Sequence, residues 1–181
     1  MFIILAVPIG LVLGFLMGGR LDRLSEIRFE WAWLAVVGLA VQVLLFSTPI
    51  GGSFRGGVGE AIYVASTGLV LVAVWRNLRV PGLALVALGA ISNLAAIVAN
   101  GGVMPTTPEA LAAAGLDPLD GFSNSAVLED PAVAPLTDIF ALPPWLPFAN
   151  VFSIGDVLIA LGVVIVVAIG MRRGDPASRP A

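Results

Sequence analysis

Five apolar stretches, each long enough to cross a lipid bilayer as a helix, dominate this chain. They cover residues 2–19, 31–50, 60–76, 80–99 and 151–171. A helix needs about 17–25 residues to cross a hydrocarbon core of roughly 30 Å. Only 12% of the residues are charged, which is too few to cover a water-soluble globule. The sequence therefore predicts an all-α membrane protein with five transmembrane helices in a single polytopic domain.

The nine basic residues are all arginines, and their positions predict how the helices are oriented. Eight of them follow the first, third or fifth apolar stretch: Arg20, Arg23, Arg28, Arg76, Arg79, Arg172, Arg173 and Arg179. Only Arg55 lies on the other side. Because cytoplasmic connections are enriched in arginine, we expect the N-terminus outside, the tail 172–181 inside, and the protein in the cytoplasmic membrane. The arginines follow the first apolar stretch, whereas a signal peptide has basic residues before its core.

A long loop, residues 100–150, joins the fourth and fifth helices on the outer side. It contains acidic residues and no basic ones: Glu109, Asp117, Asp120, Glu129, Asp130 and Asp138. Thr107 and Pro108 resemble the start of a short helix, and Gly115 resembles its end. The apolar segment around Trp145 is expected at the level of the lipid headgroups. It is either a re-entry segment that aims the fifth helix, which we favour, or a lid over a substrate.

The first helix contains small residues at intervals of four. Ala6, Gly10, Gly14 and Gly18 lie on one helix face, where another backbone can approach closely. The spacing predicts a helix-packing face. Its partner is either in this chain, in a second copy or in another membrane protein. No other stretch repeats this pattern.

Two polar positions stand out inside the apolar stretches. Asn93 shares a helix face with Gly89, Ala96 and Asn100, and its amide needs a partner in hydrocarbon. Asp156 lies near the outer start of the fifth helix, where an intramembrane carboxylate indicates function. The alternative for Asp156 is a capping box with Ser153, in which the acid stabilises the helix N-terminus.

The chain lacks cysteine and histidine, which excludes thiolate chemistry and the usual ligands of haem iron and zinc. It has no phosphate-binding loop and no basic patch typical of nucleic-acid binding. We therefore expect no cofactor, no metal and no nucleic-acid partner. The lipid bilayer is the expected environment and partner.

Two segments resemble an uncharacterised family of small bacterial integral membrane proteins, known only as a domain of unknown function. The segments are Asn100-Gly101-Gly102-Val103-Met104-Pro105 and Val151-Phe152-Ser153-Ile154-Gly155-Asp156-Val157-Leu158-Ile159-Ala160-Leu161-Gly162. The likeness covers nearly the whole chain. It implies a shared fold without an assigned activity.

A fainter likeness links the chain to lipoprotein signal peptidases (signal peptidase II). Residues 152–162 are similar to the motif F-N-x-A-D-x-x-I-x-x-G, and residues 89–93 resemble the first half of G-A-x-G-N-x-x-D-R. The resemblance implies a catalytic role for Asp156. The first catalytic aspartate of those peptidases would fall on Ala96 and the arginine after it on Ile97. Aspartyl proteolysis needs two carboxylates in one site, so the dyad is incomplete at that position.

Three functions remain open from the sequence. The first in rank is a non-catalytic protein that binds a partner or assembles through the glycine face, which is the helix-packing face of Ala6, Gly10, Gly14 and Gly18. The second is an outer-leaflet enzyme in which Asn93 and a second acid, Asp138 or Glu60, support Asp156. The third is a small transporter, for which one shallow aspartate is the only sign.

Overall fold

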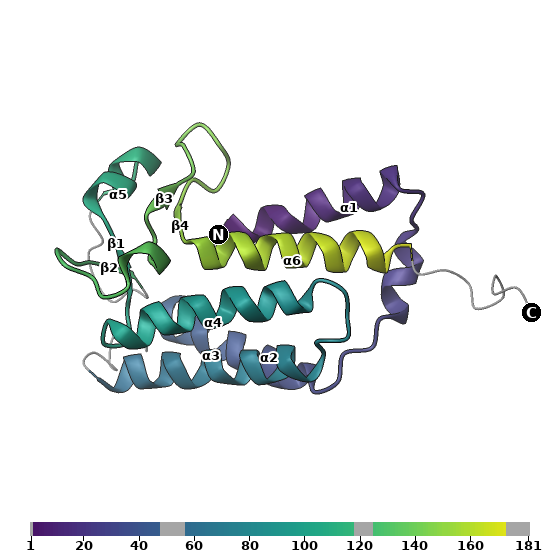
Figure 1. Cartoon of the computed structure of the whole chain (residues 1–181), viewed down its shortest axis with the longest axis horizontal. Coiled ribbons are helices and arrows are strands. Elements are labelled where there is room, and N and C mark those ends of the chain that lie inside the picture. The colour runs from purple at the N-terminus through teal and green to yellow at the C-terminus, as the bar shows by residue number, and fades with distance from the viewer. Residues whose placement is uncertain (1, 48–56, 118–124, 173–181) are drawn as a thin grey trace, which may run out of the picture.

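The computed structural model describes residues 2–47, 57–117 and 125–172, and it is mostly helical (Figure 1). Its apolar helices are α1 (Ala6–Leu16), α2 (Ala32–Ser47), α3 (Val58–Arg76), α4 (Leu83–Ala99) and α6 (Ile154–Gly170). The 3-10 helix η1 (Phe2–Leu5) leads into α1, and η2 (Leu21–Glu26) follows it. The predictions that involve Arg55, Asp120, Arg173 and Arg179 lie outside the described residues.

Most of these helices are shorter than the apolar stretches that predict them. Only α3, among the described residues, is long and apolar enough to cross a membrane, and the other four apolar helices have 10–17 residues. At 1.5 Å per residue, 17 residues span about 25 Å. The five predicted spans are thus matched by five apolar helices, of which one has full spanning length.

Local backbone geometry explains the shorter boundaries. The helix α1 stops at Leu16 because Gly18 takes a φ of +76°, which reverses the chain. The helix α4 starts only at Leu83, after Pro81 and Gly82, whose φ is +96°. Residues 151–152 form the short strand β4 instead of opening α6. In contrast, α3 begins two residues earlier than predicted.

The helix α6 lies between α1 and α4, and α3 packs against both α4 and α2 (Figure 1). Glycines of α4 and α6 permit the closest of these contacts. A Cβ added at Gly82 would overlap the carbonyl oxygen of Gly162, and one at Gly89 would overlap that of Gly155. The two antiparallel helices therefore contact each other backbone to backbone.

The small residues of α1 face α6 of the same chain. Ala6, Gly10 and Gly14 are buried, and a Cβ at Gly10 would lie 2.8 Å from the Cβ of Val167. Gly18 is exposed and has open space around it. Because Gly18 lies past the end of α1, only the first three of the four small residues are part of the helix.

The segment between α4 and α6 is folded into short elements. It contains β1 (Met104–Thr106), α5 (Pro108–Ala114), β2 (Ser125–Val127), the 3-10 helix η4 (Ala134–Leu136), β3 (Phe140–Ala141) and β4 (Val151–Phe152). The strand β1 pairs with β2 in parallel, and β3 pairs with β4 antiparallel. The predicted cap of α5 is present, because the Thr107 side chain accepts a hydrogen bond from the Ala110 N–H. These elements cover one end of the helices (Figure 1).

Candidate functional site

Asp156 lies in the first turn of α6, within a complete capping box. Its backbone N–H donates to Ser153 Oγ at 3.1 Å, and its Oδ2 accepts from the Ser153 backbone N–H at 3.1 Å. The capping geometry inferred from the sequence is therefore present. It occupies only one of the two oxygens of the carboxylate.

The other oxygen of Asp156 is bound by Asn93 of α4. Asn93 Nδ2 donates to Asp156 Oδ1 at 2.8 Å, and Asn93 Oδ1 accepts from the Ser153 hydroxyl at 2.8 Å. Gly155 is required next to this network, because a Cβ there would overlap the Asn93 amide oxygen. Both oxygens of Asp156 thus accept hydrogen bonds.

Asp138 reaches the same end of α6 through backbone pairing. Its N–H donates to the Pro105 carbonyl at 2.9 Å, and its carbonyl accepts from the Thr106 hydroxyl at 3.0 Å. Two residues later, Phe140 pairs with Phe152 of β4, which leads into the α6 cap. The chain around Asp138 is therefore held between the strand that follows α4 and the strand that precedes α6.

The environment of Asp138 differs from that of Asp156. Asp138 is 7% exposed, and its Oδ1 is buried without a hydrogen-bond partner. Burial, together with the nearby charge of Asp156, raises the pKa of Asp138 from 3.8 to about 7. Asp138 is therefore able to hold a proton near neutral pH, and its pKa responds to the charge of Asp156, whose oxygens accept hydrogen bonds. This division suits a general acid and a general base.

The other residues named from the sequence lie apart from this pair. Glu60 lies in the first turn of α3 and packs against Gly102, with a buried and unpartnered Oε2. It is not among the groups that shift the pKa of Asp138. Ala96 and Ile97 lie in a hydrophobic cluster with Leu45. Ala96, the position that corresponds to the first catalytic aspartate of signal peptidase II, therefore lies in the hydrophobic core. Among the described residues, no three acidic side chains gather closely enough for a metal ion.

Asn100, which directly follows α4, joins the loop to the end of this helix by hydrogen bonds. Its Oδ1 accepts from the Ala132 N–H at 2.8 Å, and its Nδ2 donates to the Ala96 and Ala132 carbonyls. The 3-10 helix η4 that follows Ala132 contacts both α4 and α6. Asn100 thus acts on the site indirectly, by anchoring the segment that leads to Asp138.

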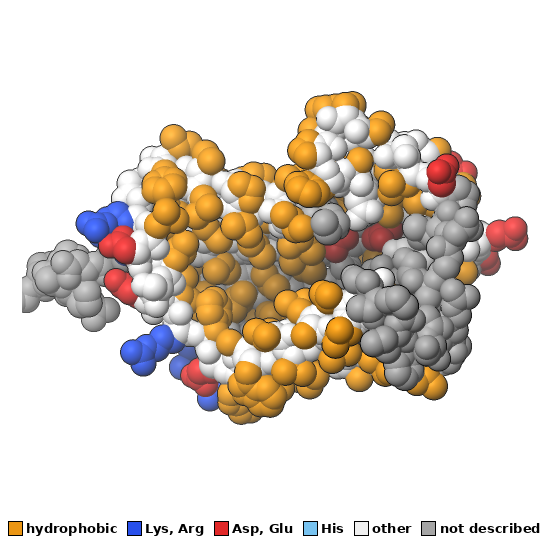
Figure 2. Space-filling model, turned by 180° about the vertical axis from the view of Figure 1, so that it is seen from behind, with side chains coloured by type: hydrophobic (Ala, Val, Ile, Leu, Met, Phe, Trp, Pro, Cys, Tyr) orange, Lys and Arg blue, Asp and Glu red, His pale blue; other side chains and the backbone are white. Residues whose placement is uncertain are grey.

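A hollow on one face of the molecule leads toward the acidic end. Figure 2 shows hydrophobic side chains along the hollow and acidic side chains at its right-hand end, beneath the folded loop. Basic side chains lie at the opposite end of the same face (Figure 2). The face therefore has an apolar middle, acidic side chains at one end and a mixture of basic and acidic side chains at the other.

From the sequence, Asp138 and Glu60 were both candidates for a second acid near Asp156, and no pattern chose between them. In the structure Asp138 is buried, whereas the loop acids Glu129 and Asp130 are exposed. The paired glycines of α4 and α6 were also missed, although each pair has a spacing of seven residues, 82 to 89 and 155 to 162.

Comparisons with known proteins give a family without an activity. The model described as a family of unknown function (DUF5317) matches residues 26–168. An uncharacterised protein from Thermotoga maritima is 37% identical over 99 residues, which are 54% of this chain and 56% of that protein. The alignment therefore spans just over half the length of that relative. No solved structure matches the chain.

Proposed function

This chain belongs to DUF5317, a family of unknown function, and we propose an activity for it from the geometry of its own site. We infer that the protein is a membrane enzyme that hydrolyses an amide or ester bond at the outer face. Asp138 and Asp156 are its acid–base pair. The observation that supports this most directly is the burial of Asp138, whose Oδ1 has no hydrogen-bond partner, within the electrostatic influence of Asp156.

The placement in the membrane is supported by the outer surfaces of the helices. Large apolar side chains point away from the protein interior: Leu16 is 78% exposed, Val36 65% and Trp75 64%. Helices that are apolar on their outward faces need hydrocarbon around them. With the arginines on the inner side, five crossings put the acid pair near the outer surface. The shorter helices span this distance if the bilayer thins locally around them.

The proposed reaction uses the two carboxyl groups in different protonation states. The Asp156 carboxylate takes a proton from water, whose oxygen attacks the carbonyl carbon, while protonated Asp138 gives its proton to the carbonyl oxygen. The resulting diol collapses: one hydroxyl returns a proton to Asp138, and Asp156 passes its proton to the leaving nitrogen or oxygen. Water is consumed, an acid and an amine or alcohol are released, and both carboxyl groups return to their starting states.

The enzyme is favoured over the binding or assembly role by two observations. The glycine face that suggested assembly, Ala6 to Gly14, is covered by α6 of the same chain. A capping role accounts for Asp156 alone and gives no reason for a second buried carboxyl group next to it. The likeness to signal peptidase II fits this proposal only in part, because the second acid comes from the loop and Ala96 occupies the family position.

Hydrolysis can be tested without knowing the substrate. The full-length protein, reconstituted in vesicles with a bacterial membrane extract, is incubated in ¹⁸O-water, and the products are analysed by mass spectrometry. The proposal expects carboxyl products labelled with ¹⁸O that disappear in both Asp138→Asn and Asp156→Asn. Glu129→Gln, which changes an exposed acid of the same loop, should retain them. Labelling that never exceeds protein-free vesicles, or that survives in either aspartate variant while both stay folded, contradicts the proposal.

A further inference from the structure

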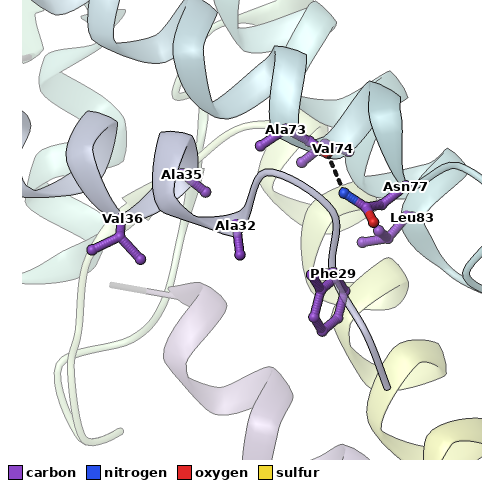
Figure 3. A pocket seen from close by; sticks show the side chains of 8 residues that line it. All are labelled: Phe29, Ala32, Ala35, Val36, Ala73, Val74, Asn77 and Leu83. Carbon is purple, nitrogen blue, oxygen red and sulfur yellow. Dashed lines mark hydrogen bonds between the residues drawn. The ribbon is translucent and has the colours of Figure 1, made fainter. Parts of the chain in front are cut away.

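A pocket of about 300 Å³ lies at the end of the helices opposite the acid pair. It is formed by the chain before α2, the start of α2, the end of α3 and the start of α4 (Figure 3). Its lining residues are Phe29, Ala32, Ala35, Val36, Ala73, Val74, Asn77 and Leu83. All but one of these side chains are hydrocarbon.

The single polar side chain of the pocket is held by the protein itself, because both N–H donors of its amide and one lone pair of its oxygen are used. Asn77 Oδ1 accepts from the Glu30 N–H at 2.8 Å, and its Nδ2 donates to the Glu30 and Ala73 carbonyls, both at 2.7 Å. The bond to Ala73 is drawn in Figure 3. The part of a ligand that enters this pocket is therefore hydrocarbon, since seven of the eight lining side chains are apolar and the Asn77 amide has no free donor.

Cations without a carboxylate partner flank the pocket in the chain. Arg28 precedes Phe29, Arg79 follows Asn77 by two residues, and both are exposed and form no ion pair with described residues. By contrast, Arg76 is bound to Glu30 at 2.7 Å and lies 5.7 Å from the Trp31 ring centre. Basic side chains at this end of the molecule are visible in Figure 2.

We propose that this pocket binds an anionic phospholipid, with part of one acyl chain between α2 and α3 and its phosphate at Arg28 and Arg79. An apolar pocket whose lining residues Phe29 and Asn77 are within two residues of an unpaired arginine in the chain is complementary to a molecule with a hydrocarbon chain and an anionic head. The inference rests on the proposed membrane placement, since it puts the pocket in the inner leaflet. It is independent of the acid pair.

The test measures the shift in melting temperature of the full chain in neutral detergent when lipid is added. Phosphatidylglycerol and phosphatidylcholine with the same acyl chains are compared. We expect phosphatidylglycerol to stabilise the protein at an at least ten-fold lower concentration, with the difference shrinking as salt is raised. The double variant Arg28→Gln/Arg79→Gln should respond to the two lipids equally. Arg172→Gln, an exposed arginine at the same end, should behave like the parent.

A variant that fills the pocket and three contrary outcomes complete the test. Ala35→Phe, which fills the pocket, should weaken the response to both lipids. If both lipids raise the melting temperature of the parent protein equally, the proposal is overturned. This outcome does not depend on whether any variant folds. A phosphatidylglycerol preference that persists in the double arginine variant also overturns the proposal. A parent that is dimeric, with Ala35→Phe monomeric and unchanged in lipid response, would assign the pocket to a second copy. Loss of hydrolysis in the aspartate variants leaves all these lipid responses unchanged, so the two proposals fail separately.

Discussion

At the scale of single residues, two aspartates differ in how their carboxyl groups are bound. Asp156 accepts hydrogen bonds from Asn93 and from the Ser153 backbone. Asp138 has a buried oxygen that accepts none. The difference is produced by tertiary contacts, because Asp138 is buried by pairing with a segment 32 residues away in the chain. The capping box of Asp156, a local pattern, was predictable from the sequence, whereas the burial of Asp138 was not.

The raised pKa of Asp138 predicts how stability depends on pH. Between about pH 4 and 7 the folded protein retains a proton at Asp138 that the unfolded chain has lost, so stability falls as pH rises across this window. The loss is of the order of a few kcal/mol, at about 1.4 kcal/mol per pKa unit. Asp138→Asn imitates the protonated form and should flatten this dependence. Melting temperatures from pH 4 to 8 measure it, and a variant that keeps the slope of the parent contradicts the assignment.

At the scale of elements, the helices were predictable and their ends were less so. The apolar stretches predicted all five, because each must place a continuous hydrocarbon surface against lipid or a neighbour. The boundaries depend on Pro81, Gly82 and Gly18, whose effects are local but compete with the apolar pattern. Which helix packs on which was not predictable, because glycine spacing indicates a close contact without naming the partner.

The contact between α4 and α6 gives a matched pair of glycine variants. Gly89→Ala would drive a Cβ into the Gly155 carbonyl and toward the Ile159 N–H at 2.9 Å, groups that cannot rotate away. Gly68→Ala, in the interior of α3, meets open space. We expect Gly89→Ala to lower the melting temperature by several degrees. Gly68→Ala should leave the free energy of unfolding unchanged or raise it by about 0.5–1 kcal/mol, since alanine is the better helix former. Equal effects of the two changes would show that α4 and α6 do not touch as described.

At the scale of the whole molecule, the expected topology places the folded loop outside and the end of α6 inside. The chain contains no cysteine, so single cysteines can be introduced at Asp117 and at Arg172, both exposed. In intact cells a membrane-impermeant maleimide should label Asp117→Cys and leave Arg172→Cys unlabelled until the cells are lysed. Labelling of Arg172→Cys in sealed cells would reverse or abolish the five-crossing topology.

Infrared spectroscopy of the carboxyl groups measures directly whether Asp138 holds a proton near neutral pH under the influence of Asp156. The full-length protein is titrated while the C=O stretching band of protonated carboxyl groups is followed. One such group should persist at neutral pH and lose its proton near pH 7. Asp138→Asn should remove this band, and Asp156→Asn should shift its titration to lower pH, because the neighbouring negative charge is gone. A protein without a carboxyl group titrating near pH 7, or with a band that survives Asp138→Asn, would contradict the account.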